Sequence, residues 1–144
     1  MTALSLRLFG GFSARGPNGE EIAMPTRKSR GLLGYLAVNA DQRQPRGRLA
    51  ALLWSDRGER QARHSLNQAL LSIRRMGAEA GVDLLDSDSE HVTLLGEAAD
   101  VDVLTFGRLI DSEPSRAVEL YEGPLLDGLA VRDPAFEDLS LIHI

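Results

Sequence analysis

The segment that most limits how this chain can fold is ERQARHSLNQALLSIRRM, residues 59–76. At 100° per residue, its apolar side chains fall in one row along one side of a helix, which is typical of a helix packed against a core. The row consists of Ala62, Leu66, Ala69, Leu70 and Ile73. The segment therefore predicts a long helix, about Gly58 to Met76, with one buried side.

The opposite side of this helix is cationic and polar. It carries Arg60, His64, Asn67, Gln68, Leu71 and Arg75, with Arg63 and Arg74 on its flank. No acidic residue lies between Arg60 and Arg75, so pairing of opposite charges four residues apart is not available within that span. Water or an outside partner must satisfy these cations.

The charge of the chain is divided between its two halves. Residues 1–78 hold 13 Arg or Lys against 5 Asp or Glu, a net charge of +8, whereas residues 79–144 hold 3 against 16, a net charge of −13. This asymmetry favours a basic part that meets a polyanion, followed by an acidic part with another role. Two solvated surfaces of opposite sign would give the same numbers.

Strand patterns come before the long helix, and a hairpin pattern follows it. Apolar and polar residues alternate over the first five positions of Leu4 to Gly10, a second short strand, GFSA, follows, and EEIAM forms a third strand after the turn Gly16 to Gly19. A small antiparallel sheet is therefore expected.

Two shorter helices are expected next, one capped by Thr26 and one after Pro45, and Ser55-Asp56 offers a cap for the long helix. VDLL and HVTLL, separated by DSDSE, predict a hairpin, and GEAAD a junction. From Val101 onward two helices are expected, with Pro114 between them. The fold class is therefore α+β.

Composition narrows the class of protein. The chain has 144 residues, 43% of them hydrophobic, and no cysteine, which fits a domain with a real core in the cytoplasm. No signal peptide or membrane span is apparent. The three histidines have no metal-ligand spacing, and no phosphate-binding glycine loop or serine elbow is present. We expect neither an enzyme nor a cofactor.

Double-stranded DNA is the partner that the cationic side fits best, because a helix enters the major groove, arginine pairs with guanine, and Asn or Gln pairs with adenine. The candidates for base contacts are Arg60, His64, Asn67, Gln68 and Leu71, whose methyl groups can meet a thymine. The candidates for phosphate contacts are Arg27, Lys28, Arg46, Arg63, Arg74 and Arg75. A protein-interaction module whose basic helix docks an acidic partner remains the alternative. A small hydrolase is a third, without a site to name.

Two stretches resemble a known family. RKSRGLLGYLAVNADQRQPRGRLAALLW and ARHSLNQALLSIRRM resemble the winged-helix DNA-binding domain of the OmpR/PhoB type, in the version that opens SARP-type transcriptional regulators, the antibiotic-regulatory-protein family. In the second helix, Arg46, Leu49, Leu53 and Trp54 carry the likeness. In the third, Ala62, Leu66, Leu70, Ile73 and Arg74 carry it. The resemblance implies a winged helix over residues 1–96, with strands, three helices and a hairpin wing.

The acidic half resembles the next domain of the same family. Asp102, Phe106 and Leu109, followed by AVELYEGPLLDGL, are similar to the start of the bacterial transcriptional activation domain, a helical TPR-like module. The resemblance implies a truncated module over residues 97–138. It also implies promoter binding, often as homodimers on direct repeats, and contact with RNA polymerase.

Two features depart from the family pattern. The predicted wing tip, residues 86–90, is acidic, so phosphates should repel it, and we expect the wing either to contribute little to affinity or to be held off the duplex. The last six residues, LSLIHI, are what CTG TCT CTT ATA CAC ATC encodes, the end of a transposase adaptor used in preparing DNA for sequencing. Residues 139–144 are therefore expected to be read-through from that adaptor.

Overall fold

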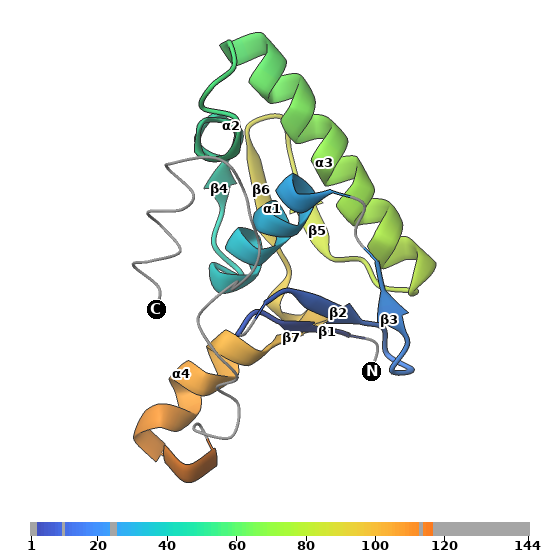
Figure 1. Ribbon diagram of the computed structural model, residues 1–144, viewed down its shortest axis with the longest axis vertical. Coiled ribbons are helices and arrows are strands. Elements are labelled where there is room, and N and C mark those ends of the chain that lie inside the picture. The colour runs from blue at the N-terminus through green and yellow to red at the C-terminus, as the bar shows by residue number, and fades with distance from the viewer. Residues whose placement is uncertain (1–2, 10, 24–25, 113, 117–144) are drawn as a thin grey trace.

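A computed structural model describes residues 3–9, 11–23, 26–112 and 114–116 (Figure 1). Its elements in chain order are β1 (Leu4–Arg7), β2 (Ser13–Arg15), β3 (Glu21–Ile22), α1 (Arg27–Val38), β4 (Gln44–Pro45), α2 (Arg46–Leu53), α3 (Glu59–Glu79), β5 (Leu85–Ser87), β6 (His91–Leu94), the short 3-10 helix η1 (Gly96–Ala98), β7 (Ala99–Val101) and α4 (Asp102–Ser112). The predicted α+β class is confirmed.

The N-terminal sheet has the strand order β3-β2-β1-β7. Leu4 and Leu6 of β1 are buried while Arg7 is exposed, as the alternation predicts. β2 pairs antiparallel with both β1 and β3, whereas β7 pairs parallel with β1, with Leu6 opposite Val101. The expected junction at residues 96–100 is therefore wrong in part, because it contains a strand. Three residues are too few to show an alternating pattern, and their partner lies at the far end of the sequence.

The three helices form where they are expected. Thr26 caps α1, since its hydroxyl oxygen accepts a hydrogen bond from the backbone N–H of Ser29 at 3.0 Å. α3 begins differently: its N-cap is Gly58, which has no side chain to form a capping bond, so the expected cap at Ser55-Asp56 is wrong. Glu59 in the first turn still places negative charge near the positive end of the helix dipole.

Glycine ends α3 sharply. The N–H of Val82 donates to the carbonyl of Gly77 at 2.8 Å and that of Gly81 to Ala78 at 3.0 Å, a pairing that needs a left-handed residue just after the helix. Gly81 supplies it with a φ of 75°. The chain then turns back under α3 toward β5.

The predicted hairpin is confirmed, with different bounds. β5 pairs antiparallel with β6, and β4 joins the other edge of β6, giving the order β4-β6-β5. Asp86 and Ser87, expected in the tip, belong to β5. Pairing continues that far because Asp88 closes a tight turn, its carboxylate accepting the backbone N–H of Glu90 at 2.8 Å and of His91 at 2.7 Å.

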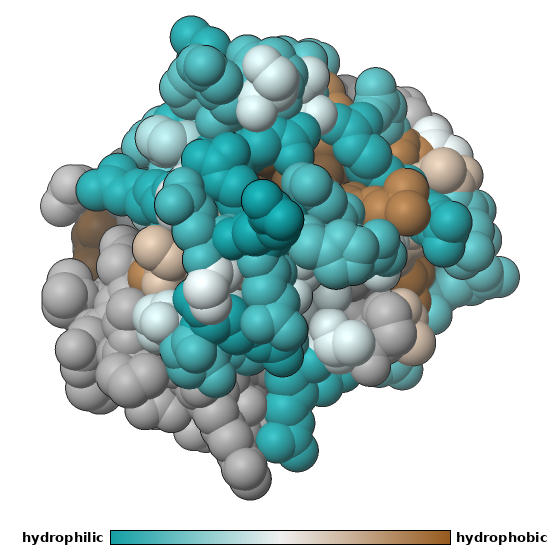
Figure 2. All heavy atoms as spheres, turned by 90° about the horizontal axis from the view of Figure 1, so that it is seen from above, coloured by the Kyte–Doolittle hydropathy of each residue, from teal (hydrophilic) through white to brown (hydrophobic). Residues whose placement is uncertain are grey.

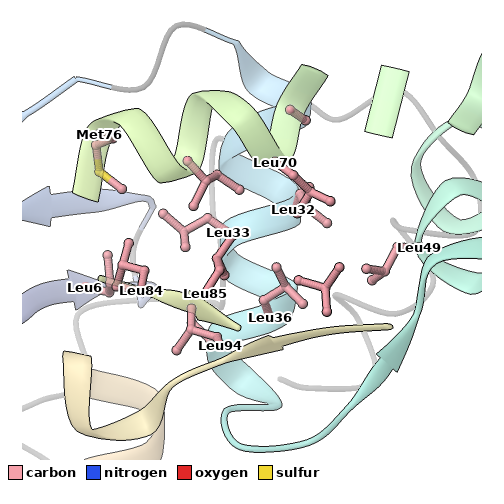
Figure 3. Packing of buried hydrophobic residues seen from close by; sticks show 14 of the residues in the cluster. Leu6, Leu32, Leu33, Leu36, Leu49, Leu70, Met76, Leu84, Leu85 and Leu94 are labelled. Carbon is pink, nitrogen blue, oxygen red and sulfur yellow. The ribbon is translucent and has the colours of Figure 1, made fainter. Parts of the chain in front are cut away.

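One leucine-rich core joins these elements (Figure 3). The labelled side chains come from both sheets, from α1, α2 and α3, and from the segment just before β5, and they point toward one another; they are Leu6, Leu32, Leu33, Leu36, Leu49, Leu70, Met76, Leu84, Leu85 and Leu94. Because each of them is at most 5% exposed, the position of α3 is fixed along its length by packing.

α4 packs against β1 and β7, at the end of the molecule away from the start of α3 (Figure 1). Phe106 meets Phe9 edge to face, with ring centroids 5.2 Å apart. The expected helix from Val101 is thereby confirmed to Ser112. The expectations for residues 117–144, which include most of the proposed activation module and the LSLIHI segment, lie outside the described residues.

Candidate nucleic-acid interface

α3 separates its buried and exposed side chains as its spacing predicts. Ala62, Leu66, Ala69, Leu70 and Ile73 are buried, and α3 packs against both α1 and α2. The predicted core side of the helix is confirmed. Because these contacts hold one side inward, the other side must face away from the core.

Every predicted contact residue on α3 is exposed: Arg60, Arg63, His64, Asn67, Gln68, Leu71, Arg74 and Arg75. Leu71 is unusual, since a large apolar side chain 41% exposed stands among charged neighbours. Viewed from the end where α3 begins, the surface is mostly hydrophilic (Figure 2). A helix with a fixed orientation thus presents one polar, cationic surface, which we call the α3 outer face and define by these eight residues.

Arg46 at the start of α2 joins three elements. Its Nη1 donates to Oδ1 of Asn67 on α3 at 2.8 Å, its Nε donates to the carbonyl of Asp88 in the hairpin turn at 2.9 Å, and its backbone N–H donates to the carbonyl of Glu90 at 2.8 Å. The guanidinium was predicted to contact phosphate. The structure places it half-buried in this internal network, beside the α3 outer face.

The hairpin turn carries its own charge pairs. The carboxylate of Asp88 lies 3.3 Å from Nη2 of Arg43, which also lies 3.1 Å from Nδ1 of His91. The backbone N–H groups of Glu90 and His91, followed by the nearby charges of His91 and Arg43, hold the pKa of Asp88 below its ordinary value. Part of the acidity predicted for this tip is therefore neutralised within the molecule, while Asp86 and Glu90 remain exposed.

The remaining arginines of α3 differ in their contacts. Arg63 lies 3.9 Å from Glu59, one turn earlier, and Arg74 donates to the hydroxyl of Ser87 in β5. Within the part of the chain that the structure describes, Arg60 and Arg75 make no hydrogen bond or ion pair. Of the arginines on α3, these two therefore have the fewest hydrogen-bond and ion-pair partners within the described residues. One lies at each end of the α3 outer face.

α1 contributes a second group of cations next to α3. Arg27 is exposed, whereas Lys28 is half-buried, donates to the carbonyl of Leu53 and lies 5.7 Å from the centre of the Trp54 ring. A hollow of about 300 Å³ opens here, and His64 and Gln68 are among the residues that line it. The structure therefore brings Lys28 together with two predicted base contacts.

Some residues at this surface were missed by the sequence reasoning. Ser87 contacts Arg74, and His91 lies in the turn beside α3, yet no local pattern marks either of them, whereas Arg43 belongs to the basic run RQPRGR, whose cations would touch phosphates if they flank the groove. Their partners are 13 to 48 residues away in the chain. Such contacts exist only once the hairpin lies beside α3 and beside the segment that carries Arg43.

Within the described ranges, no group of three or more His, Cys, Asp or Glu is placed so that it could hold a metal ion. None of the helices described is long and apolar enough to cross a membrane.

Comparison with known proteins finds a similar solved structure, but no matching family model and no matching curated sequence. Neither a scan against protein-family models nor a search of curated proteins finds a match. Among solved structures, the chain is similar to EmbR of Mycobacterium tuberculosis, solved in complex with a low-affinity phosphopeptide, at a TM-score of 0.78 and 21% sequence identity. The likeness covers 99% of this chain and 42% of EmbR, so the chain spans less than half the length of that protein. The two share an α+β fold.

Proposed function

We propose that this protein binds double-stranded DNA in a sequence-specific manner and acts in transcription regulation. Residues 1–96 form a winged-helix domain in this proposal, with α3 as the recognition helix in the major groove and the β5–β6 hairpin as the wing. Residues 97–138 begin a TPR-like activation module of the SARP type. The likeness of the fold to EmbR supports this assignment.

The observation that carries the proposal is the α3 outer face. A helix held by buried residues on one side presents arginines, two amides, an imidazole and one apolar side chain on the other. These are the groups that read base edges in the major groove, through forked donors, amides and methyl contacts. In this proposal Arg27, Arg63, Arg74 and Arg75 contact the phosphates on either side of the helix, and such contacts set register and orientation.

Direct binding is the first test. A fluorescently labelled pool of random duplexes, measured by anisotropy, should bind with an affinity that falls steeply as salt increases, because arginines displace counterions from phosphates. Arg75→Met should reduce the slope of log K against log salt by about 1. Arg108→Met, at an exposed residue of α4, which packs against β1 and β7, is the matched control and should leave the slope unchanged.

The competing function is an interaction module for an acidic protein partner. It predicts equal retention on DNA and on an acidic polypeptide such as polyglutamate, and no enriched sequence after selection from the random pool. Duplex binding that does not weaken with salt would contradict the DNA proposal. Binding by RNA polymerase and dimerisation on direct repeats are further parts of the proposal, to be tested with the selected duplex.

A further inference from the structure

We propose that Arg46 is a positioning residue, which holds the side chain of Asn67 at a fixed place beside the hairpin turn and contacts no base itself. This inference rests on the proposed function, because it concerns how firmly one predicted base contact is placed. It assigns no particular base to Asn67. It states that the discrimination Asn67 provides at its base pair depends on Arg46.

The guanidinium of Arg46 bonds to two elements at once. Its Nη1 donates to Oδ1 of Asn67 on α3 at 2.8 Å, and its Nε donates to the carbonyl of Asp88 in the hairpin turn at 2.9 Å. Because the guanidinium is planar and rigid, the directions of these two donors are fixed relative to each other. The Asn67 amide is therefore held relative to the turn as well as by its own rotamer.

The backbone of Arg46 is anchored too. Its N–H donates to the carbonyl of Glu90 at 2.8 Å, and α2, which begins at Arg46, packs against both α1 and α3. The carboxylate of Asp88 closes the turn by accepting the N–H groups of Glu90 and His91. Moving the guanidinium away from Asn67 would therefore also disturb its bond to a turn that is held by hydrogen bonds of its own.

This arrangement leaves Asn67 able to contact a base. The amide oxygen keeps a second lone pair after its bond to Arg46, and the amide nitrogen has two N–H groups. Asn67 is exposed on the α3 outer face. An exposed amide without a partner samples several rotamers, so fixing it in advance reduces the conformational entropy that a base contact costs.

The neighbouring amide has no such support. Gln68 is exposed on the same face, and its side chain makes no hydrogen bond within the described residues. In the free protein, the side-chain amide of Asn67 should therefore be more ordered than that of Gln68. NMR relaxation of the two side-chain amide groups measures this difference. Equal mobility of the two groups would overturn the inference.

Binding to selected duplexes tests the consequence for recognition. Selection from a random pool with the full chain and with its Asn67→Ala variant identifies the base pair at which the variant loses its preference. Discrimination there is the ratio of the affinities for the best and the worst base pair, measured by anisotropy. Arg46→Met should lower this ratio by roughly fivefold, the lower end of the range for a base contact, and leave the ratios at other positions unchanged.

The ratio separates positioning from other roles of Arg46. A phosphate contact through its remaining N–H groups would add equally to the affinity for every duplex, so it cancels in the ratio. A general loosening of the fold would lower discrimination at all positions. In the Asn67→Ala background, Arg46→Met should cause no further change at this position, because the two residues act as one unit.

Arg48→Met is the matched control, since it removes one charge at an exposed residue of the same helix. It should leave every ratio unchanged. If Arg46→Met fails to fold in a thermal melt, the NMR comparison of Asn67 with Gln68 in the wild type decides the inference.

Three outcomes of the duplex experiments would overturn the inference while leaving the proposed function intact. They are unchanged discrimination with Arg46→Met, a loss spread equally over all positions, and no position altered by Asn67→Ala. Absence of any enriched sequence for the wild type would overturn the proposed function together with the inference.

Discussion

The carboxylate of Asp102 accepts a hydrogen bond from the backbone N–H of Leu8 at 2.9 Å, across 94 residues of sequence. Its second oxygen accepts from the N–H of Phe9 at 3.2 Å, and the N–H of Val103 donates to the first at 2.7 Å. One side chain thus accepts hydrogen bonds from backbone N–H groups just after β1 and in the first turn of α4. It joins the beginning of the chain to the segment that follows β7.

Removing this carboxylate should loosen that junction. Asp102→Ala leaves partly buried N–H groups of Leu8 and Phe9 without an acceptor, so we expect the free energy of unfolding to fall by about 1–3 kcal/mol. Urea denaturation measures it. Asp100→Ala, at an exposed neighbour, should change stability by less than about 0.5 kcal/mol. Equal effects of the two substitutions would show that the contacts to Leu8 and Phe9 do not stabilise the fold.

The carboxyl groups of Asp102 and Asp88 should have pKa values on opposite sides of the ordinary value for aspartate. Burial raises the pKa of Asp102 above 3.8, an effect that its three N–H donors only partly offset. Hydrogen bonds from the N–H groups of Glu90 and His91 lower the pKa of Asp88 below 3.8. An NMR titration of the side-chain carboxyl carbons should give this order, and the reverse order would contradict both assignments.

These directions also fix the sign of each contribution to stability. The folded protein binds a proton at Asp102 more tightly than the unfolded chain does, so that contribution is complete below pH 3.8 and is lost as pH rises through the raised pKa. The contribution of Asp88 is complete above pH 3.8 and is lost as pH falls through its lowered pKa. Comparing Asp102→Asn and Asp88→Asn with wild type in denaturant melts between pH 3 and pH 6 measures both trends.

Two leucines on α3 should have different roles, one in the stability of the fold and the other in DNA binding. Leu66 is fully buried, and Leu66→Ala should cost about 2–5 kcal/mol of stability because it leaves a cavity in the core. Leu71 is 41% exposed, and Leu71→Ala should change stability by less than about 0.5 kcal/mol. Thermal unfolding separates the two, and selection on random duplexes should show altered preference for thymine only with Leu71→Ala.

Gly77 should tolerate no side chain, although it lies within a helix. A Cβ at this position would sit 2.7 Å from the carbonyl oxygen of Val82, so Gly77→Ala should destabilise the protein by about 1–3 kcal/mol. Gly107 on α4 is the matched control, since its Cβ would meet nothing within 4 Å. Gly107→Ala should stabilise by about 0.5–1 kcal/mol through helix propensity. A gain in stability from Gly77→Ala, measured by urea denaturation, would contradict the clash.

Local patterns were sufficient for much of the fold. The alternation in β1, the Thr26 cap of α1 and the apolar row of α3 depend on residues within a few positions of one another, so periodicity reveals them. The same row predicts which α3 residues face outward, because a helix that buries one side must expose the other. Strand β7 escaped prediction, since its three residues pair with a strand more than 90 positions earlier.

By itself, the sequence determined the α+β class, the helix that bears the cations and the residues on its exposed side. Only the tertiary structure decided which of those cations are bonded within the protein and which remain available to an outside partner. Packing of α2 against α3 brings Arg46 to Asn67, and the position of β5 brings Ser87 to Arg74. Arg60 and Arg75 are left without such partners among the described residues. The physical reason is one of range. An α-helix repeats every 3.6 residues, so a local stretch of sequence shows which side chains share one side of it, whereas hydrogen bonds between elements depend on distances in space that no local pattern encodes.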